Sequence, residues 1–219
     1  MTQVPDGAIL QRDEHTLAIV PRTPAGLITP EHLEAIARIA LKYKVPQLKI
    51  TSGQRIAMIG IEPGQYEALW SDLQMQVGHA VEPCVHYVQT CPGTHWCTFG
   101  LQDSIGLGLE LEQRLSGKSA PAKVKLGVSG CTACCAESYV RDIGLIGTKK
   151  GWIVSFGGNS GSKPRIGDAI ARHVDRATAI DLTERLLALY VEHGTKLKRT
   201  SKFVDRVGID WVKQQLGLE

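Results

Sequence analysis

Three observations predict an α+β fold. It consists of a small first lobe and a larger second domain of mixed strands and helices. Residues 16–75 alternate between strand-like and helix-like patterns and form a unit of their own. A cysteine cluster directly follows a strand-like run at 123–128. Apolar residues at 178–193 repeat with the period of a helix. We therefore expect a first lobe over residues 1–78 and a second domain over residues 79–219.

The first lobe contains three strand patterns and two helix patterns. TLAIVPR at 16–22 is strand-like, and Thr29 is a suitable N-cap because Pro30 follows it at the first helical position. The apolar face expected for this helix comprises Leu33, Ile36, Ala37 and Ala40. QLKITSGQRIAMIGI at 47–61 predicts two strands joined by a bend, and PGQYEALWSDLQ at 63–74 predicts a short helix.

The second domain begins with a stretch of low regularity before its first cysteine pair. A helix follows, and the apolar face expected for it comprises Leu101, Ile105, Gly108, Leu111 and Leu115. KVKLGV at 123–128, IGLIG at 143–147 and WIVSF at 152–156 predict strands. The last two flank a turn at 149–151, and GGNSGSKPR at 157–165 is a glycine-rich loop.

The C-terminal part is predicted as a long amphipathic helix and a short final segment. The apolar positions of this helix are Ile180, Leu182, Leu186, Leu187, Leu189 and Val191. KLKRTSK at 196–202 is expected to be a basic connector.

Composition argues against several classes of protein. A chain of 219 residues can bury a core without disulfides, and a net charge of +3 with three Phe and four Trp does not favour nucleic acid as a partner. The start of the chain lacks the apolar stretch of a secretion signal, and no run of about 18 apolar residues suggests a membrane span. We expect a cytoplasmic protein, in which clustered cysteines are more often metal ligands or redox groups than disulfides.

Four of the six cysteines form two pairs. Five residues separate Cys91 from Cys97, and three separate Cys131 from Cys135. Structural zinc sites usually use two-residue spacings in tight turns, so these spacings favour an iron–sulfur cluster. Zinc and unligated buried thiols remain the alternatives.

Several motifs together resemble the sulfite and nitrite reductase family. CPGTHWCTFGLQDSIGLGLELE, GVSGCTACCAE, DIGLIGTKKGW and FGGNSGSKPR are similar, in this order, to the sirohaem and 4Fe–4S module of that family. PRTPAGLIT and LKITSGQRIAMIGI resemble its ferredoxin-like, substrate-side lobe, so the resemblance extends over residues 16–212. The small, single-copy assimilatory-type sulfite reductases are the most similar, followed by the sirohaem module of bacterial nitrite reductases.

The resemblance implies a ligand set. Cys91, Cys97, Cys131 and Cys135 would hold the 4Fe–4S cluster, and Cys135 would also bridge to the iron of sirohaem. Cys84 and Cys134 match no ligand of the family, and we expect both to be small buried thiols. A shift of register by one residue would make Cys134 the ligand instead.

Basic side chains are the candidates for binding the substrate. Lys123 and Lys125 alternate along a strand and so point to one face, and they resemble the family's lysines that bind the oxyanion and supply protons. Without the resemblance, two solvated lysines on an edge strand would be the commoner explanation. Arg22 resembles an arginine aimed at substrate or macrocycle. His86 stands where related nitrite reductases tend to have arginine, and it is either a proton donor or a structural histidine.

Two further segments resemble contacts to the macrocycle. In the first, Arg55 lies two residues beyond Gly53, where many relatives have arginine, and these positions share one face of a strand. The candidates in this segment are Thr51, Ser52, Gln54 and Arg55. The second is the glycine-rich loop, whose backbone N–H groups suit carboxylates, although a flexible hairpin is the alternative. Its candidates are Gly157, Gly158, Asn159, Gly161, Lys163 and Arg165.

We therefore expect a six-electron reductase that converts sulfite to sulfide, with nitrite to ammonia as the alternative. A non-catalytic iron–sulfur electron carrier and a zinc-bound interaction domain are the alternatives from other classes. The sequence shows no flavin or nicotinamide motif, so the electrons are expected from a separate ferredoxin or flavoprotein. A single copy of the module favours a homodimer that shares its sites, or a site closed within one chain.

Overall fold

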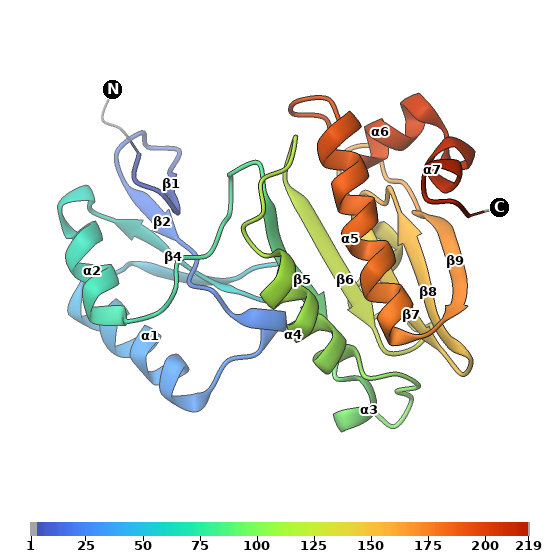
Figure 1. The fold of residues 1–219 in the computed structure, drawn as a ribbon. Coiled ribbons are helices and arrows are strands. Elements are labelled where there is room, and N and C mark those ends of the chain that lie inside the picture. Colours follow the sequence, from blue (N-terminus) through green and yellow to red (C-terminus); the bar gives the residue numbers. More distant parts are fainter. Residues whose placement is uncertain (1–3, 219) are drawn as a thin grey trace. The chain divides into compact units, whose positions relative to one another are not determined.

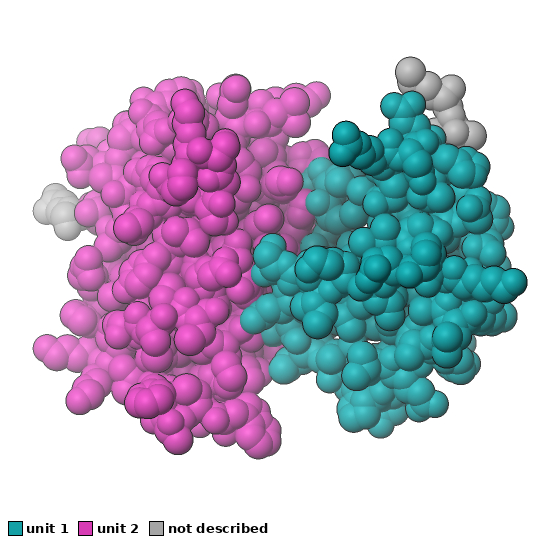
Figure 2. All heavy atoms as spheres, turned by 180° about the vertical axis from the view of Figure 1, so that it is seen from behind, with its two compact units in different colours: residues 1–82 teal, residues 83–219 magenta. Residues whose placement is uncertain are grey.

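The computed structural model describes residues 4–218, which form two compact units (Figure 1). Unit 1 ends at Glu82 and unit 2 begins at Pro83 (Figure 2). Within the described range, no helix is long and apolar enough to cross a membrane.

Unit 1 is a four-stranded antiparallel sheet in the order β1-β2-β4-β3, packed against two helices. Its elements are β1 (Ala8–Leu10), β2 (Leu17–Ile19), α1 (Pro30–Lys42), β3 (Gln47–Ile50), β4 (Ile56–Ile61) and α2 (Tyr66–Leu73), with 3-10 turns at Pro24–Gly26 and Pro63–Gln65. Ile19 and Met58 of the sheet are fully buried against Leu69 of α2. The Thr29 hydroxyl accepts a hydrogen bond from the His32 N–H at 3.2 Å and caps α1, as predicted.

Unit 2 is a five-stranded sheet in the order β5-β6-β7-β8-β9, parallel from β5 to β7 and antiparallel from β7 to β9. Its elements are β5 (Val85–Thr90), α3 (Gly93–Trp96), α4 (Ser104–Leu115), β6 (Val124–Ser129), β7 (Ile143–Thr148), β8 (Gly151–Phe156), β9 (Asp168–Val174), α5 (Arg176–His193), α6 (Thr200–Val207) and α7 (Ile209–Gln215), with a 3-10 turn at Ser138–Val140. Helices α4 and α5 lie side by side on one face of the sheet (Figure 1). The α+β fold class expected from the sequence is confirmed.

The apolar faces differ from the expected ones at several positions. In α1, Leu33 is 50% exposed, whereas Ile36 and Ile39 are buried. In α4, Leu107 faces the core, and Leu101 lies before the helix begins. In α5, Val191 is exposed. The packing of each helix against its sheet selects a narrower stripe of residues than its apolar content indicates.

Three segments have more regular structure than predicted. The stretch of low regularity before Cys91 contains β5, and all six residues of this strand are buried. Asp168–Val174 forms β9, which was not predicted. The basic connector ends at Arg199, because Thr200 already begins α6.

Candidate functional site

Two cysteine loops leave the sheet of unit 2 at the same edge. Strands β5 and β6 are parallel neighbours, and Cys91 follows the first while Cys131 follows the end of the second. The backbone N–H of Gly130 donates to the Sγ of Cys91 at 3.1 Å. The carboxyl ends of neighbouring parallel strands are a common place for ligand sites, and the loops that carry the two cysteine pairs begin at this end of the sheet.

The two loops pack against each other through glycine. A Cβ at Gly130 would lie 2.8 Å from the carbonyl oxygen of Gln102 and 2.9 Å from the Cα of Gly93. The backbone N–H groups of Leu101 and Gln102 donate to the carbonyl of Gly130 at 2.9 and 3.0 Å. Cys97 ends the short helix α3, where its N–H donates to the Gly93 carbonyl at 2.9 Å. Backbone contacts thus fix the segment after Cys97 beside the segment before Cys131.

The adjacent cysteines Cys134 and Cys135 have different environments. The Sγ of Cys134 accepts hydrogen bonds from the Tyr139 N–H at 3.4 Å and the Ser129 hydroxyl at 3.8 Å. Cys135 is exposed. These contacts direct the Cys134 sulfur toward the protein and favour Cys135 as the metal ligand. Cys84 is only 5% exposed, in agreement with a buried thiol, whereas Cys134 is only partly buried and differs from that expectation.

The chemistry of the donor set suits an iron–sulfur cluster, whose usual ligands are cysteine thiolates. All six cysteines are free thiols. Among residues 4–218, no group of three or more His, Cys, Asp or Glu side chains is close enough to hold one metal ion. If Cys91 is a ligand, the bond from Gly130 is of the kind that tunes the reduction potential of a cluster.

Lys125 of β6 has an environment that weakens its affinity for a proton. Its side chain is half-buried, and its Nζ lies 5.7 Å from the ring centre of Tyr87 on β5. Burial, followed by the positive charges of Arg199, Arg141 and Lys123, lowers the pKa of Lys125 to about 8 against the opposing effect of Asp142. Lys123 is exposed just before β6.

Asp142 and Arg199 were not identified from the sequence. Asp142 is fully buried at the start of β7, and both of its oxygens accept hydrogen bonds from Arg199, the N-cap residue of α6. The Thr200 hydroxyl donates to the same carboxylate at 2.6 Å. The signal in the sequence was an acidic residue immediately before the apolar run IGLIG, since a buried carboxylate requires a cationic partner.

Arg141 is a second buried cation beside the cysteine loop. Its Nη2 donates to Gln89 and to Glu137, both at 2.5 Å. Its Nε has no hydrogen-bond partner within the described part of the chain. Arg141 therefore links the turn after Cys135 to strand β5.

The glycine-rich loop is closed by its own side chains. Asn159 and Arg165 exchange backbone hydrogen bonds at 2.9 and 2.8 Å, and the Asn159 side chain donates to the Lys163 carbonyl at 2.8 Å. Arg165 forms ion pairs with Asp168 at 2.5 Å and Asp205 at 3.3 Å. Gly158 is buried, whereas the Lys163 side chain is exposed.

The predicted arginines of unit 1 are held by hydrogen bonds. Arg22, just after β2, donates from Nη1 to the Gln76 side chain at 2.7 Å. Arg55 is buried and donates from Nη1 to the carbonyl of His79 at 2.6 Å.

The remaining candidates lie in the β3–β4 turn of unit 1 and in β5 of unit 2. The Thr51 hydroxyl accepts a hydrogen bond from the N–H of Arg55 at 3.2 Å. Ser52 is exposed, and Gln54 has a left-handed backbone with φ of 59°. His86 on β5 is only 4% exposed. Burial at this level favours a structural histidine over one that meets solvent.

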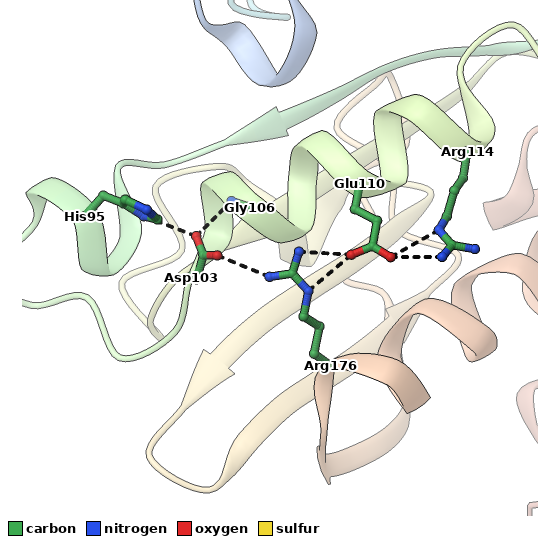
Figure 3. A network of polar contacts seen from close by, with 6 residues as sticks. All are labelled: His95, Asp103, Gly106, Glu110, Arg114 and Arg176. Carbon is green, nitrogen blue, oxygen red and sulfur yellow. Dashed lines mark hydrogen bonds and ion pairs between the residues drawn. The ribbon is translucent and has the colours of Figure 1, made fainter.

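A network of ion pairs supports the first cysteine loop from outside (Figure 3). His95 of α3 pairs with Asp103 at 3.2 Å, and Asp103 also caps α4 by accepting from the Gly106 N–H at 2.8 Å. Arg176 joins Asp103 at 3.1 Å to Glu110 at 3.0 Å. The network continues from Glu110 to Arg114, so α3, α4 and the start of α5 are connected by polar contacts.

Large aromatic side chains are exposed on the same loop. Trp96 is 82% exposed and Phe99 is 77% exposed, and they lie on either side of Cys97. Lys149 and Lys150 are exposed at the β7–β8 turn. The Gln102 side chain connects the cysteine loop to this turn by donating a hydrogen bond to the Thr148 carbonyl at 2.9 Å.

Comparisons with known proteins agree with this arrangement. Residues 82–219 match the "Nitrite and sulphite reductase 4Fe-4S domain" family, and residues 9–76 match the "Nitrite/Sulfite reductase ferredoxin-like half domain" family. The chain is 53% identical over 214 residues to the assimilatory-type sulfite reductase of Nitratidesulfovibrio vulgaris, and the match covers 98% of each chain. It is 41% identical to the NADH nitrite reductase large subunit of Escherichia coli K12, but spans only 25% of that protein.

Two solved structures share the fold. One is dissimilatory sulfite reductase I, with a TM-score of 0.84 and 15% identity over 94% of this chain and 70% of that one. The other is the Mycobacterium tuberculosis NirA protein, with a TM-score of 0.81 and 18% identity over 91% of this chain and 39% of that one. Together, the cysteine loops, the two matched domains and the full-length relative establish that the chain belongs to the nitrite and sulphite reductase family.

Proposed function

We propose that the protein reduces sulfite to sulfide with a 4Fe–4S cluster and sirohaem. The observation that carries the proposal is the meeting of two cysteine loops at one edge of the sheet, where Gly130 donates to the sulfur of Cys91. The relative that spans the same length as this chain is named a sulfite reductase, and this favours sulfite over nitrite. When bound, the two cofactors supply one-electron steps at an iron atom that binds the anion.

The cysteines of the two loops divide into ligands and a structural thiol. Cys91, Cys97, Cys131 and Cys135 would hold the cluster, and exposed Cys135 would also serve the sirohaem iron. Cys134 keeps the turn in shape through its bonds to Tyr139 and Ser129.

The cationic side chains bind the anion and deliver protons. Conversion of hydrogen sulfite to the hydrogen sulfide ion takes up six electrons and six protons and releases three water molecules. Lys125, with a pKa of about 8, carries a proton at neutral pH that it can donate to an oxygen that is leaving. Lys123 adds a second positive charge just before the same strand. Arg22 and Arg55 are further candidates for contacts to the anion or to the carboxylates of the macrocycle.

Electrons come from a separate donor protein. Trp96 and Phe99 beside Cys97 form an exposed apolar surface, and Lys149 and Lys150 add positive charge near the same loop. This combination suits an acidic ferredoxin or flavoprotein.

Turnover with a strong artificial reductant tests the function. Anaerobically isolated protein, loaded with iron, sulfide and sirohaem, should convert sulfite to sulfide faster than nitrite to ammonia, and Lys123→Met/Lys125→Met should lose turnover while keeping the visible spectrum. A loaded protein that reduces neither anion would be an electron carrier instead. Faster turnover of nitrite would favour the alternative substrate.

A site shared between two chains is tested by mixing. Protein lacking both lysines, combined with protein in which Cys135 is replaced by serine, regains activity only if one chain supplies cations to the cofactors of another. If the subunits have exchanged and activity does not recover, the whole site lies within one chain.

A further inference from the structure

A buried ion pair connects the C-terminal part of the chain to the strand that carries Lys125. The Asp142 carboxylate accepts the backbone N–H of Lys125 at 2.8 Å through the oxygen that also binds Nη2 of Arg199. The Nε of Arg199 donates to the other oxygen at 3.0 Å. The side chain of Asp142 is fully buried, so water cannot replace the Arg199 guanidinium as the partner of this carboxylate.

We propose that Arg199 is a positioning residue for Lys125: through Asp142 it holds the strand residue that bears the amine, and its guanidinium places a permanent positive charge near that amine. The proposal rests on the proposed function only for the importance of Lys125 in turnover. Its effect on the amine is a property of the fold.

The charges around the Lys125 amine come from four elements. Lys123 precedes β6, and Arg141 and Asp142 immediately precede β7. Arg199 is the N-cap residue of α6, and the Tyr87 ring lies against the amine from β5. Lys123 is exposed, so water and salt screen its charge.

Both arginines are paired with a carboxylate, Arg141 with Glu137 and Arg199 with Asp142. The Arg199 side chain is 24% exposed and fixed by two bonds to Asp142. In the balance of effects on the pKa of Lys125, Arg199 follows burial directly and exceeds the opposing effect of Asp142. The identity of residue 199 should therefore decide at which pH the amine loses its proton.

Competitive labelling of the folded, cofactor-loaded protein tests this inference. Pulses of acetic anhydride at successive pH values, followed by mass spectrometry of the peptide with Lys125, give the titration midpoint of its amine. We expect a midpoint near pH 8 in the unaltered protein and in Arg199→Lys, which keeps the charge. Arg199→Met should raise the midpoint by about one pH unit, since one positive neighbour is lost.

A second variant covers the case in which Arg199→Met does not fold, because it leaves a buried carboxylate without its partner. Arg199→Met/Asp142→Asn removes both charges and should still raise the midpoint, though by less. If a folded variant without Arg199 has an unchanged titration midpoint of the Lys125 amine, the inference is wrong. Arg199 then only anchors α6. A raised midpoint without any change in the pH profile of sulfite turnover supports the inference and refutes the role proposed for Lys125.

Discussion

The backbone N–H of Gly130 donates to the Sγ of Cys91 at 3.1 Å, across 39 residues of sequence. This bond joins the loop of the first cysteine pair to the loop of the second. It requires close approach of two backbones, which a side chain at residue 130 would prevent.

Gly130→Ala should therefore impair assembly of the cluster. The added Cβ would meet the Gln102 carbonyl at 2.8 Å, so the two loops must separate. We expect a loss of at least half of the bound iron and acid-labile sulfide after anaerobic reconstitution. Gly64→Ala is the matched control, because a Cβ there has nothing within 4 Å. Full loading of Gly130→Ala would contradict the close packing of the two loops.

Serine substitutions at the two adjacent cysteines should have different effects. Cys135→Ser should lose the cluster, because the exposed thiol is the proposed ligand. Cys134→Ser should retain iron and lose about 1 kcal/mol of unfolding free energy, since only hydrogen bonds to its sulfur change. Iron content, visible absorbance and urea unfolding separate these outcomes. If Cys134→Ser loses iron and Cys135→Ser keeps it, Cys134 is the ligand instead of Cys135.

Trp96→Ala/Phe99→Ala should slow electron delivery by a protein donor. Both rings are exposed beside Cys97, and aromatic side chains often dominate binding at interfaces. We expect a rise of about tenfold or more in the KM for a reduced ferredoxin, with unchanged turnover by a small artificial reductant. Leu41→Ala, at a position 81% exposed in unit 1, is the control. Equal effects on both reductants would indicate damage to the cluster instead of a docking surface.

The ion-pair network around Arg176 should contribute modestly to stability. The side-chain hydrogen bond from Arg176 holds the pKa of Glu110 below its ordinary value. Arg176→Met should lower the unfolding free energy by up to about 1 kcal/mol at low salt, and by less in high salt, because these side chains are partly exposed. Urea unfolding at two ionic strengths measures both effects, with Lys202→Met as a control for a surface pair outside this network. A loss that does not depend on salt would point to packing.

Local patterns predicted much of this fold. Thr29 and Pro30 predicted the start of α1, and the apolar run KVKLGV predicted β6, because caps and strand runs are encoded in neighbouring residues. The spacing of the cysteines gave the two pairs, and the adjacent motifs gave the family.

Long-range partners could not be predicted in the same way. Strand β5 has a buried sequence without strict alternation, so its VHYVQT segment did not stand out from a loop. Arg199 lies in a stretch that reads as a solvated basic connector, and only the fold brings it to Asp142, 57 residues earlier. The role of such a residue depends on which carboxylate it meets, and no local pattern encodes that.

The pKa of Lys125 predicts how turnover depends on pH. The ammonium form, which is proposed to bind the anion and donate the proton, predominates below about pH 8 and is lost as the pH rises through that value. At one pH unit above the pKa, kcat/KM for sulfite should be about tenfold below its plateau. In Lys125→Arg the guanidinium stays charged, so the variant should be slower at neutral pH but should lack this decline. Measuring both proteins at each pH with the same artificial reductant cancels the ionisation of sulfite itself. Parallel declines in the two proteins would show that another group controls the alkaline limb.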